Sequence, residues 1–142
     1  MLRKIIGAVV GYVVFTFCLF ALFSGLYAIL GTTGSFESGN YNITITWILA
    51  GFVVFFVGGS VSGFVYSAIA RAGSPVVMVG VILVVGILIA ISQVVSDPGV
   101  TVREAGEVAM MDAMNKARQP AWVLFLNPVF SAVGAFVGGR RV

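Results

Sequence analysis

The sequence predicts an all-α polytopic membrane protein: four transmembrane helices in an antiparallel bundle, with one short amphipathic extramembrane helix between the third and fourth. Of the 142 residues, 60% are hydrophobic and only 9% are charged, whereas roughly 25% are charged in soluble domains. Four charge-free apolar stretches reach or exceed the ~20 residues that a helix needs to cross a bilayer. The charged residues fall between and beside these stretches, so residues 1–142 are predicted to form a single membrane domain.

The predicted spans are residues 5–30, 43–70, 76–95 and 121–139. They should be helical, because backbone polar groups in lipid must be satisfied internally and the alternating pattern of a membrane barrel is absent. The first stretch could also be read as a cleaved signal peptide, but it exceeds the usual apolar core of about 7–15 residues, which favours a retained helix. The turn at residues 71–75 is so short that the second and third spans must be antiparallel neighbours.

Basic residues beside the span ends predict the orientation. One side carries five basic residues and no acid, namely Arg3, Lys4, Arg71, Arg140 and Arg141. The other side carries three basic residues, Arg103, Lys116 and Arg118, together with all five acids. The sequence therefore predicts an integral protein of a bacterial inner membrane with both termini in the cytoplasm.

Residues 101–118 predict the extramembrane helix. Thr101 and Glu104 have the spacing of a capping box, while Lys116 and Arg118 complement the dipole at the other end. The expected apolar face contains alanine, glycine and methionine, whereas helices that insert into lipid carry bulky anchors. We therefore expect this face to pack on protein, as a lid over the bundle, a docking surface for another subunit, or a gate over a path.

Small residues recur at intervals of four within the spans, as in transmembrane helices that approach closely. These candidate packing residues are Gly51, Gly59, Gly63 and Ser67 in the second span, and Ser131, Ala135 and Gly139 in the fourth. Gly134 and Gly138 lie beside the second row. The rows could pack inside one bundle or form a self-association face, and the two roles are compatible.

No ionisable residue lies well inside a span, which argues against proton- or cation-coupled transport and against intramembrane catalysis by a carboxylate. Asn127 precedes Pro128, which frees a backbone carbonyl one turn earlier. If the third and fourth spans pack closely, Asn127 can bond across to Gln93 or Ser92. Gln93, Asn127 and Ser131 then either join helices or form the polar lining of a path or ligand site.

The absence of histidine and the single cysteine exclude triad-type catalysis, a structural zinc site and an iron–sulfur centre within this chain. No catalytic residue, metal or cofactor is expected, and dispersed basic residues do not favour nucleic-acid binding. The sequence therefore favours a non-catalytic membrane protein that acts through helix packing, as a small homo-oligomer or an accessory subunit. Its expected partners are the lipid bilayer and either itself or other membrane subunits. The alternative is a small channel or facilitator for a neutral or weakly charged solute.

Overall fold

A computed structural model of the chain describes residues 1–71, 74–97, 99 and 102–141. The described residues contain five helices, which are α1 (Leu2–Ser35), α2 (Ile45–Ala70), α3 (Val76–Val95), α4 (Met110–Lys116) and α5 (Ala121–Gly139). Four of them are long and apolar enough to cross a membrane. The predicted fold class, with four spans and a short helix between the third and fourth, is confirmed.

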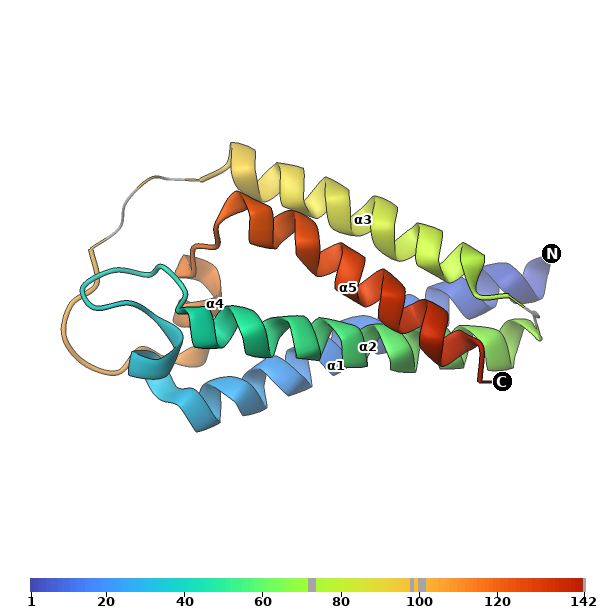
Figure 1. The fold of residues 1–142 in the computed structure, drawn as a ribbon, viewed down its shortest axis with the longest axis horizontal. Coiled ribbons are helices and arrows are strands. Elements are labelled where there is room, and N and C mark those ends of the chain that lie inside the picture. Colours follow the sequence, from blue (N-terminus) through green and yellow to red (C-terminus); the bar gives the residue numbers. More distant parts are fainter. Residues whose placement is uncertain (72–73, 98, 100–101, 142) are drawn as a thin grey trace.

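The four long helices run antiparallel in chain order (Figure 1). Both termini and the α2–α3 turn lie at one end of the bundle, which we call the terminal end. The loop after α1, the segment between α3 and α5, and α4 lie at the other end, which we call the cap end. The largest helix contacts join α2 to α5, α1 to α2, and α3 to α5, so α5 and α2 form the centre and α1 and α3 flank them.

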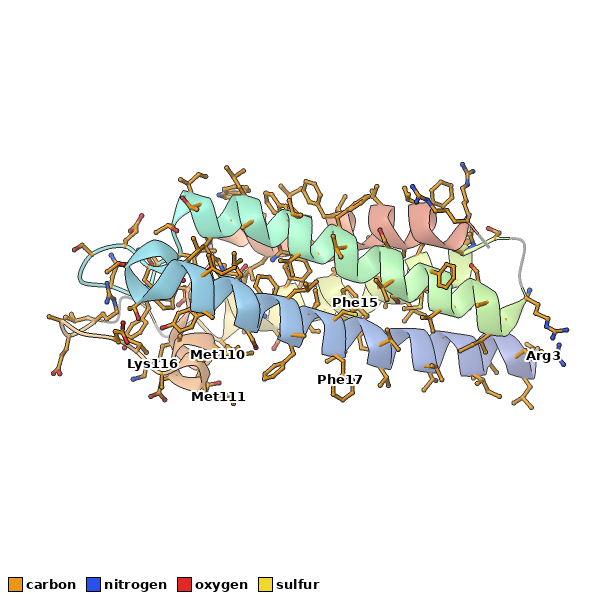
Figure 2. All side chains as sticks on the ribbon, turned by 90° about the horizontal axis from the view of Figure 1, so that it is seen from below. Arg3, Phe15, Phe17, Met110, Met111 and Lys116 are labelled. Atoms are coloured by element: carbon orange, nitrogen blue, oxygen red, sulfur yellow. The ribbon has the colours of Figure 1, made fainter. Side chains whose placement is uncertain are left out.

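Apolar side chains lie on both the inner and the outer surfaces of the bundle. On α1, Phe15 points into the bundle and is 7% exposed, whereas Phe17 points away and is 71% exposed (Figure 2). Exposed valine, leucine and phenylalanine side chains continue around the outside of the other long helices. This distribution suits a protein surrounded by hydrocarbon, in which outward apolar groups need no protein partner.

The first helix is longer than the predicted span at residues 5–30. It begins at Leu2 and continues to Ser35 through a break at Gly31, whose φ of 64° is in the left-handed region. One further helical turn follows this break, and Ser35 Oγ donates to the carbonyl oxygen of Gly31 at 2.7 Å. The α2 helix begins two residues later than predicted, because Thr44 caps it by accepting from the backbone N–H of Trp47 at 3.2 Å.

The predicted extramembrane helix over residues 101–118 is much shorter in the structure, where only Met110–Lys116 is helical. The backbone of residues 102–109 is bonded elsewhere: the Arg103 N–H donates to Gly39 O at 2.9 Å, and the Val108 N–H donates to Thr32 Oγ1 at 3.1 Å. These long-range bonds replace the local bonds that a helix would make. Thr101, the first member of the predicted capping box, lies outside the described residues.

The cap end has a small core of its own. Phe36, Tyr41 and Ile43 from the loop after α1 pack with Ile48, Ala113 and Val123 from three helices. Two backbone bonds join that loop to the segment between α4 and α5, from the Ile43 N–H to Arg118 O and from the Arg118 N–H to Tyr41 O. The Arg103 guanidinium also donates to the carbonyl oxygens of Asn40 and Glu37, each at 3.0 Å. The cap is therefore a packed structure that holds α4 against α1.

Candidate functional site

The glycines of α2 and α5 pack reciprocally, backbone against backbone. A Cβ placed on Gly59 or Gly63 of α2 would lie closer than 3.0 Å to the carbonyl oxygen of Ser131 or Ala135, respectively. Glycines of α5 meet α2 in the same way, since a Cβ on Gly134 would meet Phe56 O and one on Gly138 would meet Ser60 O. Only glycine allows the two backbones to approach so closely. In lipid there is little hydrophobic drive between helices, so close van der Waals contact of this kind stabilises their association.

The remaining predicted packing residues lie at the two ends of the same helices. Gly139 faces Pro75, and the position of its absent Cβ lies 2.9 Å from Ser67 Oγ. Gly51 faces α1 instead, where Phe23 is the nearest side chain at 3.7 Å. The structure thus brings six of the seven predicted residues to the α2–α5 contact, or to its continuation at Pro75, and assigns Gly51 to the α1–α2 contact.

The α1–α2 contact uses glycine less tightly and adds a hydrogen bond. Ser62 Oγ donates to the carbonyl oxygen of Gly11 at 2.9 Å in a fully buried position. A Cβ placed on Gly7 would lie 3.2 Å from the carbonyl oxygen of Tyr66, and one on Gly11 would lie 3.2 Å from that of Ser62, which is tighter than an ordinary contact but looser than between α2 and α5. A bond of this kind between helices is worth only about 0.6 kcal/mol in membrane proteins, so close packing carries most of this contact.

At the α3–α5 contact, the ring of Pro128 packs directly against Gly86. A Cβ on Gly86 of α3 would lie 2.6 Å from the ring of Pro128. The preceding residue, Asn127, donates from Nδ2 to Gln119 Oε1 at 3.1 Å. The predicted bond from Asn127 to Gln93 or Ser92 is wrong. The rotation of α5 directs Asn127 toward Gln119, two residues before its own helix begins, and both Gln93 and Ser92 remain exposed.

A cavity of about 280 Å³, which we call the mid-bundle cavity, lies between α1, α3 and α5. Its lining includes all three residues of the predicted polar lining, Gln93, Asn127 and Ser131. Gln119, which the sequence analysis did not single out, joins them. Its place just before Pro120 resembles an ordinary loop, and only the folded position of α5 brings it to the cavity.

A second cavity of about 340 Å³, the cap cavity, lies beneath α4. Met110, Ala113, Met114 and Ala117 form its roof at the helical spacing that the sequence assigned to the apolar face. Aromatic rings line its walls; Phe23 and Trp47 stack with centroids 5.6 Å apart, and Tyr27 meets Trp47 edge-on at 6.3 Å. Thr16, Leu19, Phe55 and Gln119 line both cavities, so the two spaces adjoin each other.

An ion pair joins the segment after α3 to the segment between α4 and α5. Arg118 Nη2 lies 2.6 Å from Asp97 Oδ2, and Arg118 Nε donates to Asp97 Oδ1 at 3.0 Å. These hydrogen bonds are the main reason that the pKa of the Asp97 carboxyl lies below its ordinary value. Asp97 is exposed. We interpret the pair as a structural contact that holds two segments of the cap together.

Within the described part of the chain, no group of three or more His, Cys, Asp or Glu side chains is placed to hold a metal ion. Comparison with protein-family models, with curated proteins and with solved structures finds no match. Argument about function therefore depends on the geometry of the helices, the cap and the cavities.

Proposed function

We propose that the protein is a non-catalytic membrane protein that acts through helix packing, as a small homo-oligomer or as an accessory subunit of a larger membrane complex. The observation that carries this proposal is an unfilled apolar groove between α1 and α3 at the terminal end. We call it the terminal groove, and its volume is about 620 Å³. A transmembrane helix from another chain or another copy would fill it.

The groove walls have the spacing of helix-packing ridges. The α1 wall is formed by Ile5, Ala8, Val9, Tyr12 and Val13, which recur at the intervals of one helical face. The α3 wall is formed by Val77, Val81 and Val85, each four residues after the last. Gly80 of α3 also has open space where its Cβ would be. Valine and small residues keep the surface shallow and regular, which favours close packing by an incoming helix.

The channel alternative has one observation in its favour, since the polar residues that line the mid-bundle cavity include Gln93, Gln119, Asn127 and Ser131. Packing below the cavity argues against a path through the bundle. Tyr66 and Met78 are fully buried there, and Ile82 is 2% exposed. A solute that entered from the cap end would meet this closed layer. The channel is therefore only the second candidate.

We also infer a bacterial inner-membrane location with the terminal end in the cytoplasm. The terminal end carries Arg3, Lys4, Arg71, Arg140 and Arg141 without an acid, and basic residues beside span ends favour the cytoplasmic side. Figure 2 places Arg3 at the opposite end of the bundle from Lys116 and Met110, so the cap would face outward.

The proposal is tested by measuring the mass of the purified protein in mild detergent and identifying what co-purifies with it. We expect a homo-oligomer or a stoichiometric complex that Val81→Trp dissociates, because the indole fills the terminal groove. Val53→Trp is the matched control, since Val53 is 62% exposed on the outer face of α2. A monomer without partners would contradict the proposal, and a wild-type protein that makes liposomes permeable to small neutral solutes would favour the channel.

A further inference from the structure

We propose that the adjoining cap and mid-bundle cavities form one binding site for an uncharged single-chain amphiphile from the bilayer, such as a monoacylglycerol. This inference does not depend on the terminal groove, which lies at the other end of the α1–α3 side. The cavities measure about 340 and 280 Å³. Joined, they fall within the roughly 300–1,000 Å³ range of small-molecule sites, which suits a single-chain amphiphile rather than a two-chain phospholipid.

The site opens sideways at the depth of hydrocarbon. Figure 1 shows α1 and α3 diverging from the terminal end toward the cap end, and the cavities lie where the helices have separated. Thr16, Phe20 and Ile89 contribute to the lining and are themselves exposed on the outer surface of the bundle. A lipid chain can therefore enter from the bilayer without crossing water, and α4 closes the site toward the cap.

The lining is apolar and aromatic, with polar groups gathered in one region. Phe23, Trp47 and Phe55 provide a surface along which an extended chain would pack, and burying each methylene contributes about 0.8 kcal/mol. The amides of Gln93 and Gln119 lie near the cap-end termini of α3 and α5, at the level where an ester or hydroxyl group of a lipid sits.

The two amides have hydrogen-bonding capacity to offer. Gln119 Oε1 accepts from Asn127, which leaves its Nε2 without a protein acceptor among the described residues. Gln93 makes no side-chain hydrogen bond to any described residue. Among the described residues, no charged side chain lines either cavity, so an ionised headgroup would have no counter-charge there, whereas a carbonyl or hydroxyl could bond to the amides. The electrostatics therefore select an uncharged polar group.

The chain carries a built-in reporter for the test. Trp47 lines the cap cavity, whereas Trp122 is 52% exposed and is the only other tryptophan. A Trp122→Phe variant in detergent is titrated with a monoacylglycerol whose chain carries bromine, which quenches indole fluorescence on contact. We expect saturable quenching at about one probe per chain. A Trp47→Phe variant, which retains only Trp122, should instead show quenching that rises in proportion to the probe content of the micelle.

Two variants test the position of the site. Thr16 lies where the cavities meet, and its hydroxyl bonds only to Tyr12 O in its own helix, so Thr16→Phe should fold and weaken binding at least about tenfold. Thr16→Val, which keeps the shape, should bind as the parent does. An ionised brominated fatty acid at neutral pH should bind more weakly than the monoacylglycerol. Non-saturable quenching of Trp47, unchanged binding by Thr16→Phe, or equal affinity for the fatty acid would each overturn the proposal.

Discussion

The glycines between α2 and α5 differ from the other glycines of the spans in what surrounds them. Gly59, Gly63, Gly134 and Gly138 each face a backbone carbonyl of the opposite helix, and a carbonyl cannot move aside as a flexible side chain can. Gly80 of α3 has open space in the corresponding direction. Replacing a glycine should therefore lower stability at the α2–α5 contact but not at Gly80. The difference depends on whether the backbone of a neighbouring helix lies against the glycine.

Gly63→Ala should destabilise the protein, and Gly80→Ala should not. At Gly63 the new methyl group would push α2 away from Ala135, with an overpacking cost toward the upper end of about 1–3 kcal/mol. At Gly80 the methyl group meets nothing, and replacing a helical glycine by alanine contributes about 0.5–1 kcal/mol of stability. Thermal unfolding in one detergent measures both effects. Equal shifts of the two midpoints would contradict the close α2–α5 contact.

The Asp97–Arg118 pair should make the cap sensitive to acid. Because the Arg118 hydrogen bonds lower the pKa of Asp97 below its ordinary value of 3.8, the pair contributes stability above that value and loses it as pH falls through the lowered pKa. The midpoint of Asp97→Asn should therefore lie below that of wild type at neutral pH, and the two should converge below pH 3.8. Glu104→Gln is the control. A difference that closes well above pH 3.8 would refute the assigned cause.

The long helices were predictable because their ends are marked by charges, which are costly in hydrocarbon. The α3 and α5 bounds agree with the predicted spans to the residue, and the differences at Gly31 and Thr44 depend on local caps and breaks. The partner of Asn127 was not predictable, because helices that are apolar all round carry little sequence signal of their rotation. The short α4 was not predictable either, since residues 102–109 bond to segments distant in sequence.

The attachment of that segment depends strongly on one buried hydroxyl. Thr32 Oγ1 lies 2.9 Å from Tyr27 Oη and accepts from the Val108 N–H, and Tyr27 Oη also donates to Val108 O. Thr32→Val should therefore lower stability by about 1 kcal/mol and speed hydrogen exchange of the Val108 amide. Thr33→Val is a matched control, because Thr33 is exposed. Unchanged exchange at Val108 in the Thr32 variant would show that the cap is held by other contacts.

The two ends of the bundle have opposite chemical character. All five acids of the chain, Glu37, Asp97, Glu104, Glu107 and Asp112, belong to the cap end, where loops and α4 form a folded structure. The terminal end consists of the two chain ends and the short α2–α3 connection, and its charged residues are basic. One of them, Arg140, places its guanidinium carbon 4.0 Å from the centroid of the Phe136 ring. A folded cap with acids must be translocated if it faces outward, whereas the basic end resists translocation. The basic residues of the terminal end are therefore what supports the proposed orientation.

That orientation makes a prediction about labelling from outside the cell. In a Cys18→Ala background, Ser38→Cys and Asn115→Cys at the cap end should react with a membrane-impermeant maleimide on intact cells, because both positions are exposed. Ser74→Cys, also exposed but in the α2–α3 turn, is the matched control and should react only after permeabilisation. The reverse pattern would place the cap in the cytoplasm, and the amphiphile site would then draw from the inner leaflet, with its geometry unchanged.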